Sequence, residues 1–184
     1  MSRIFNARRL DVAAFSQAKA QLSGHDPVQN YERLSNELHG PAPGVLIDWQ
    51  AEGGQRRAVD GGTYVALHLN AGADLPLTCQ LCMGEIIEPV TVDRHFLFLA
   101  DEDAAASLDE SSEEDDVLAL SSEFDLQALI EDEMLMALPL VPRHEQCPEA
   151  PTLASDDADF EAALKDKAKP FASLASLKGS LKSK

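Results

Sequence analysis

The sequence predicts an α+β fold: a small antiparallel sheet, an N-terminal helical segment, and an acidic amphipathic helix that covers the sheet. Three observations support this class. Stretches between residues 45 and 100 alternate apolar and polar side chains with the period of two that is typical of strands. The segment 125–138 repeats apolar residues at spacings of three and four, the period of a helix. Glycine and proline clusters separate these segments, as expected for turns.

The first forty residues have a helical pattern. Asp11 can cap a helix that we expect to run to about Leu22 and to end at Ser23–Gly24. A second short helix or an irregular packing segment is expected at 31–38, before the Pro-Ala-Pro-Gly break at 41–44. The N-terminal part of the domain is therefore expected to be helical.

Four stretches are expected to form the strands of an antiparallel meander: 45–51, 63–70, 74–79 and 86–100. Gly53–Gly54 and Gly61–Gly62 are interpreted as turns. Pro76 predicts an edge strand or a strand start, because proline cannot donate a hydrogen bond to a neighbouring strand.

The segment 101–116 contains nine acidic residues and no basic residue. Like charges repel, and the segment has few apolar side chains to bury. We therefore expect a mobile, solvated acidic loop, with a role in interactions as the alternative.

The segment 125–138 has the most distinctive pattern in the chain. Asp125 can cap a helix, and Pro139 would end it because the residue before a proline disfavours helical geometry. The apolar stripe expected to pack on the sheet comprises Leu126, Leu129, Ile130, Met134 and Leu138. Three acids lie largely off this stripe: Glu131, Asp132 and Glu133.

We expect a single domain over residues 1–150 and a flexible C-terminal tail over 151–184. From residue 165 onward the tail has six lysines and one acid. Phe171, Leu174 and Leu177 are three residues apart, and with Lys178 they would suit an amphipathic helix in a partner's groove or a contact with RNA. A disordered terminus is the alternative.

The net charge of −17 argues against a protein that grips nucleic acid over a broad surface. It is compatible with basic partners, although solubility alone would also explain it. No apolar run approaches membrane-spanning length, and we find no secretory signal. The odd number of three cysteines argues against a disulfide framework, so we expect a cytoplasmic location. We also expect no contact with a membrane.

All three cysteines fall in two short pairs, Cys79-x-x-Cys82 and His144-x-x-Cys147. Zinc favours four Cys and His ligands in a tetrahedron, so these residues would supply a Cys₃His set for one structural zinc ion. Gly84 would let the backbone turn toward the metal. Three alternatives remain open: small buried hydrophobic residues, a site that has lost its metal, and a redox pair of Cys79 and Cys82.

The other histidines show no arrangement of nucleophile and base that would indicate catalysis. They are scattered along the chain: His25, His39, His68 and His95. We expect His68 and His95, which occupy strand positions, to be ordinary surface or packing residues.

Three segments in this order resemble the YceD family, whose members are described as large ribosomal RNA subunit accumulation proteins: LTCQLCMGEIIEPV, FDLQALIEDEMLMALPLVPRHEQC and PFASLASLK. The resemblance covers Leu75 to Cys147 and the C-terminal tail. It implies a role in the synthesis, processing or stability of 23S rRNA in large-subunit assembly, without catalytic activity. Some relatives carry additional cysteines near His144–Cys147, which this chain lacks.

Our first hypothesis is a non-enzymatic ribosome-biogenesis factor whose partner is a ribosomal protein or a pre-ribosomal particle of the large subunit. The acidic loop and the helix acids would meet a basic protein, and the tail would contact rRNA. The partner-binding residues in this hypothesis are Asp125, Glu131, Asp132, Glu133, Phe171, Leu174, Leu177 and Lys178.

The alternative hypothesis is a zinc-dependent enzyme or a zinc-containing nucleic-acid-binding module. Four protein ligands would fill the coordination sphere of zinc and leave no position for a substrate water. The net charge disfavours the nucleic-acid module.

Overall fold

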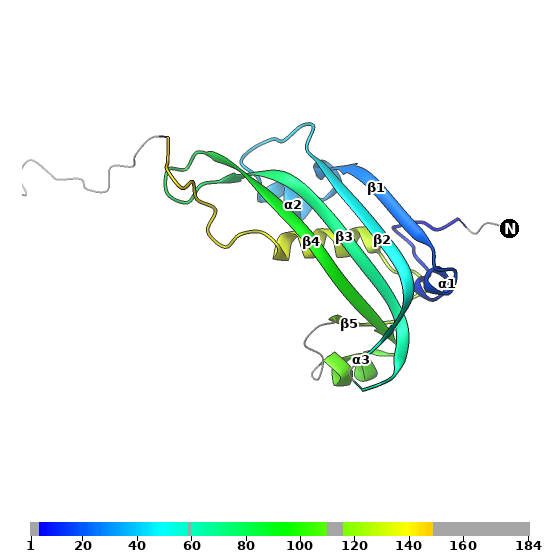
Figure 1. The fold of residues 1–184 in the computed structure, drawn as a ribbon. Helices are drawn as coiled ribbons and strands as arrows, with labels where there is room; N and C mark the ends of the chain where they lie inside the picture. Colours follow the sequence, from blue (N-terminus) through cyan, green and yellow to red (C-terminus); the bar gives the residue numbers. More distant parts are fainter. Residues whose placement is uncertain (1–3, 59, 110–115, 149–184) are drawn as a thin grey trace, which may run out of the picture. The chain divides into compact units, whose positions relative to one another are not determined.

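The structure is a computed structural model that describes residues 4–58, 60–109 and 116–148 (Figure 1). Contacts divide the chain into two units, Met1–Pro148 and Glu149–Lys184, and all of the second unit lies outside the described residues. The expected tail, with Phe171, Leu174, Leu177 and Lys178, is in that second unit.

A five-stranded sheet forms the centre of the domain, in the order β1-β2-β3-β4-β5. All neighbouring strands are antiparallel except β4 and β5, which are parallel. The expected α+β class is confirmed, but the sheet is mixed and larger than the four-stranded antiparallel meander that we expected. The strands are β1 (Gln21–Pro27), β2 (Leu46–Arg57), β3 (Thr63–Thr78), β4 (Glu85–Leu99) and β5 (Asp116–Ala119).

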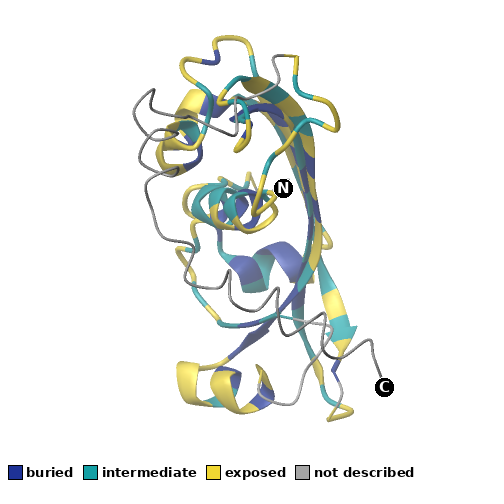
Figure 2. Cartoon of the chain, turned by 90° about the vertical axis from the view of Figure 1, so that its left-hand side faces the viewer, coloured by how far each residue is buried: buried dark blue, intermediate teal, exposed yellow. Residues whose placement is uncertain are grey.

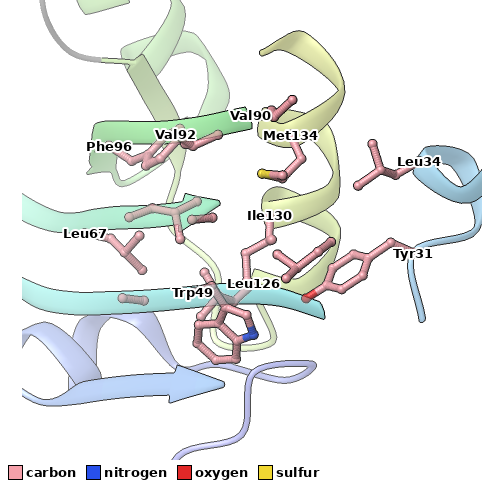
Figure 3. Close-up of a cluster of buried hydrophobic side chains, with 14 of the residues drawn as sticks. Tyr31, Leu34, Trp49, Leu67, Val90, Val92, Phe96, Leu126, Ile130 and Met134 are labelled. Atoms are coloured by element: carbon pink, nitrogen blue, oxygen red, sulfur yellow. The ribbon is translucent and has the colours of Figure 1, made fainter. Parts of the chain in front are cut away.

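The helical segments other than residues 102–109 lie along one side of the curved sheet, and their buried residues face it (Figure 2). Ile130 and Met134 of α4 point toward the strands and are fully buried, among Leu67 and Val92 of the sheet (Figure 3). Tyr31 packs beside α4 from the segment before α2. The segments that contribute to this main core are α1 (Val12–Gln17), the 3₁₀ turn η1 (Val28–Asn30), α2 (Glu32–Asn36) and α4 (Leu126–Met136).

A second, smaller core lies on the opposite face of the sheet at one end. Ala66 and Leu97 are paired across β3 and β4, and they pack with Leu108 of α3 (Glu102–Asp109). The interpretation of 101–116 as a loop is therefore wrong for α3, while residues 110–115 lie outside the described residues. Ala105 and Leu108 recur three residues apart among the acids, and their burial under a tertiary contact outweighs the charge pattern.

The N-terminal helix is shorter than expected. Asp11 caps α1 by accepting a hydrogen bond from the Ala14 amide (2.9 Å), but the helix ends at Gln17. Residues 21–27, including Ser23–Gly24, form β1 instead of the helix end. Gly24 is opposite Trp49, and a Cβ there would approach the indole ring to 2.7 Å. The glycine thus makes room for an aromatic ring in a strand pair and does not stop a helix.

The pair Gly53–Gly54 lies inside β2 and not in a turn. A Cβ on Gly53 would lie 2.7–2.9 Å from the ring and backbone of Phe15, so this glycine permits α1 to approach the strand closely. Gly61 does lie in the turn between β2 and β3, with φ +84°. Identical glycine pairs therefore have different roles, which depend on what packs against them.

The two expected strands 63–70 and 74–79 form the single strand β3. β2 pairs with β3 only over Thr63–Gly72, so Pro76 lies where β3 has no strand neighbour on that side. The Pro76 carbonyl accepts a hydrogen bond from the His39 amide there (2.8 Å). In an antiparallel strand, the carbonyl and the nitrogen of one residue point to the same side. The missing N–H of Pro76 therefore costs no hydrogen bond to a neighbouring strand.

Candidate metal centre

Cys79, Cys82, His144 and Cys147 converge in the structure. The two cysteines of the first pair lie in the turn between β3 and β4, and the second pair follows α4. The ligand atoms of all four residues lie within 4.8 Å of one another. Cys79 Sγ is 3.9 Å from Cys147 Sγ, and Cys82 Sγ is 3.5 Å from His144 Nδ1. In a tetrahedral zinc site, ligand atoms are about 3.5–3.8 Å apart, so the arrangement suits that ion.

The β3–β4 turn holds the first pair through backbone hydrogen bonds. The Cys79 amide donates to the Gly84 carbonyl, and the Met83 amide donates to the Cys79 carbonyl, both at 2.9 Å. Met83 has φ 61°, whereas Gly84 is not among the glycines with positive φ. The expectation that Gly84 supplies the backbone reversal is therefore wrong, and Met83 adopts the left-handed conformation.

A backbone contact orients the imidazole of His144. Its Nε2 is 3.1 Å from the Glu85 carbonyl oxygen. A carbonyl only accepts hydrogen bonds, so the proton is on Nε2 and the lone pair of Nδ1 faces Cys82. Metal-binding histidines commonly use such a contact to set their tautomer and ring orientation. The Gln80 amide also donates to the Pro142 carbonyl (2.9 Å), which joins the segment after α4 to the turn.

The site contains thiols with opposite pKa shifts. Backbone amides of Cys82, His144 and Leu81 stabilise the thiolate of buried Cys79 and lower its pKa to about 5. Burial, and then the neighbouring thiols of Cys82 and Cys79, raise the pKa of Cys147 to about 11. A divalent cation would favour the thiolate form of every cysteine, because it supplies the positive charge that this group of ligands lacks.

The described acids proposed to bind a partner all have contacts within the domain. Asp125 caps α4 by accepting a hydrogen bond from the Ala128 amide at 3.0 Å. Glu131 accepts hydrogen bonds from the Arg33 side chain and from the amides of Arg33 and Leu34.

The other two helix acids are also paired. Asp132, whose side chain is half exposed, contacts Arg33 at 2.6 Å. Glu133 is buried, and its carboxylate lies 3.9 Å from Arg94 Nε. Sequence reasoning missed both arginines as partners, because Arg33 is about 100 positions and Arg94 about 40 positions from the acids they contact, and such separations leave no local signal.

The mixed sheet and the Cys₃His group define the class: an α+β protein with a candidate structural metal site that joins a strand turn to the segment after α4. Residues 67–178 match the family described as "Large ribosomal RNA subunit accumulation protein YceD". The match spans more than half of the chain and includes both ligand pairs and α4, so the chain belongs to the YceD family. No solved structure matches the chain. Among the described residues, no helix is long and apolar enough to cross a membrane.

Proposed function

We propose that the protein is a non-enzymatic ribosome-biogenesis factor that supports the synthesis, processing or stability of 23S rRNA during large-subunit assembly. The observation that carries this proposal is the family match over residues 67–178. The family's description refers to accumulation of the large-subunit ribosomal RNA. The partner in this proposal is a ribosomal protein or a pre-ribosomal particle of the large subunit.

The Cys₃His group supports a structural role for a metal and not a catalytic one. Four protein ligands would complete a tetrahedral zinc ion and leave no open position for a water or a substrate. Cys79, Cys82, His144 and Cys147 would hold the ion, which would link the β3–β4 turn to the chain after α4. This link would hold the β3–β4 turn and residues 139–148 in a fixed relation.

The acidic surface that would meet a basic ribosomal protein includes the N-terminal part of α3. Asp101, Glu102 and Asp103 are all exposed there, and the segment 101–109 has no basic residue. On α4 the contact would use Asp132, because Glu131 and Glu133 are largely covered. Opposite charge would accelerate association and make it sensitive to salt. The lysine-rich tail would contact rRNA.

Depletion of the protein from its cells tests the biological role. We expect less 23S rRNA and a lower ratio of large to small ribosomal subunits on a sucrose gradient. Re-expression of the full chain should restore both. Normal 23S rRNA and a normal subunit ratio after complete depletion would contradict the proposal.

Charge reversal tests the surface. The double variant Glu102→Lys/Asp103→Lys should recover less basic large-subunit protein in a pull-down at low salt, whereas the unmodified chain should lose its partner only at high salt. Glu37→Lys/Asp74→Lys makes the same change of charge at two exposed acids elsewhere and serves as the matched control. Equal recovery by the two double variants would rule out a specific role for the α3 acids.

A further inference from the structure

A second group of potential metal ligands lies on the face of the sheet opposite the main core. His68 of β3 is directly opposite His95 of β4, and the next pair on the same face is Asn70 with Asp93. Leu67 and Leu69, the neighbours of His68 in sequence, are buried in the main core. Since side chains alternate along a strand, His68, Asn70, Asp93 and His95 share the other face.

The distances within this group suit a small cation. The imidazole rings of His68 and His95 are stacked, with centroids 4.0 Å apart and planes at 18°. His68 Nε2 lies 2.6 Å from Asp93 Oδ1, and the ligand atoms of His68, Asp93 and His95 all lie within 4.8 Å of one another. Two N or O ligands on a tetrahedral zinc ion are about 3.3 Å apart, which lies between these limits. Because the lone pairs of stacked imidazoles point in nearly parallel directions, the two rings would tilt toward each other when they and Asp93 bind one ion.

We propose that His68, Asp93 and His95 form a second metal site, which binds a divalent ion of the zinc, nickel or copper class. Imidazole is a preferred ligand of these three ions, and a carboxylate completes a set of three. The ion would replace the proton shared by His68 and Asp93. Three protein ligands leave at least one position for water or for a group from another molecule, so this ion would exchange more readily than one held by four ligands.

Apolar residues flank one side of this group of ligands. The next pair in the ladder on the same face is Ala66 with Leu97, and both belong to the apolar core under α3. That core therefore lies beside the histidine pair. The His68 side chain is 30% exposed, whereas that of Asp93 is 73% exposed.

The same face contains a natural comparison. His25 and Asp48 form a similar histidine–carboxylate pair across β1 and β2. Among the described residues, this pair belongs to no group of three close metal ligands, unlike the pair at His68. His25 therefore serves as the control. It shows whether nickel binding needs the three-ligand group or arises from the weak affinity that any exposed imidazole has for nickel.

Calorimetry with Ni²⁺ tests the proposal on the full chain, purified without a His-tag and first saturated with one equivalent of Zn²⁺. A zinc-sensitive dye would monitor release of that first ion. We expect one equivalent of Ni²⁺ to bind without zinc release. His68→Ala and His95→Ala should each weaken binding by at least about tenfold, since even outer-shell partners contribute about 10–100-fold to metal affinity. His25→Ala should bind like the unmodified chain.

A second measurement does not depend on how the variants fold. In NMR spectra of the unmodified chain, substoichiometric Ni²⁺ should broaden the ring signals of His68 and His95 before those of His25 and His39. Absence of a nickel equivalent, nickel binding that persists in both alanine variants, or equal broadening of all four histidines would overturn the proposal.

Discussion

Two adjacent glycines in β2 differ in what surrounds them. A Cβ on Gly53 would meet the ring and backbone of Phe15 at 2.7–2.9 Å, whereas a Cβ on Gly54 would meet nothing within 4 Å. The backbone of α1 at Phe15 cannot withdraw without disturbing its buried side chain. Gly53 therefore controls how closely α1 packs on the sheet, and Gly54 does not.

Gly53→Ala should consequently destabilise the domain by about 1–3 kcal/mol, the usual cost of overpacking a well-filled site. Gly54→Ala is the matched control, and it should be neutral or slightly stabilising because alanine loses less backbone entropy on folding. Urea denaturation followed by circular dichroism gives both values. Equal stability of the two variants would show that α1 does not pack against Gly53 as described.

Glu133 is a buried carboxyl whose burial outweighs its attraction to Arg94, so its pKa is raised above the usual value. A raised folded-state pKa means that the protonated form is favoured in the fold. The contribution of this group is therefore most favourable below the unfolded-state pKa and is lost as pH rises through the folded-state pKa.

Glu133→Gln imitates the protonated form and should remove this pH dependence. At pH 7 the variant should unfold at the same temperature as the unmodified chain or a higher one, and the difference should shrink toward pH 4. Thermal unfolding across this range measures it. A variant that is less stable at pH 7 and comparable at pH 4 would mean that the ion pair with Arg94 outweighs the burial.

At the scale of elements, α4 supports α2 through one side chain. α2 has no side-chain cap of its own, since its N-cap residue is Tyr31. The Glu131 carboxylate takes the place of that cap, because it accepts hydrogen bonds from the Arg33 and Leu34 amides at 2.7 and 3.3 Å. Its negative charge at a helix N-terminus is also favourable. Glu131, which the sequence suggested as a partner-binding residue, thus links α4 to α2.

Glu131→Ala should therefore lower the free energy of unfolding by about 1–3 kcal/mol, the range for hydrogen bonds to charged groups. Glu123→Ala is the control, because its ion pair with Arg9 is exposed on both sides and should contribute less than about 1 kcal/mol. Chemical denaturation of both variants gives the comparison. If Glu131→Ala lowered the free energy of unfolding no more than Glu123→Ala does, Glu131 would not cap α2 and would be available to bind a partner.

At the scale of the whole molecule, the Cys₃His group joins segments more than sixty residues apart in sequence. Ligands that bind only the folded state stabilise it by mass action, by about 2.7 kcal/mol when the free ligand exceeds Kd about a hundredfold. Metal at this site would therefore stabilise the domain as well as position the chain after α4.

Chelation should lower the unfolding temperature of protein purified without a His-tag, and one equivalent of Zn²⁺ should restore it. In Cys147→Ser, chelator and zinc should have a much smaller effect, while His25→Ala should respond like the unmodified chain. Metal analysis after dialysis should give about one tightly held zinc per chain, because four ligands saturate a structural site. Less than a tenth of an equivalent, with all cysteines reduced, would exclude the structural zinc.

Much of the domain could be predicted from local patterns. The strand 86–100 and the helix 125–138 correspond to β4 and α4 within one or two residues. The four ligands were visible as two spaced pairs, and the structure brings them together. Local patterns failed where a contact overrides them: α3 forms within an acidic segment because Ala105 and Leu108 are buried, and β1 begins where a helix was expected.

By itself, then, the sequence determined the α+β class and the ligand types of the candidate metal centre, because these depend on periodicity and on spacing within short segments. The family also followed from the sequence, through the match over residues 67–178. The tertiary structure alone decided the roles of Gly53 and Glu131, and it alone aligned His68 with His95. These features depend on strand register and helix docking. Both are set by contacts between residues distant in sequence, and no local pattern encodes them.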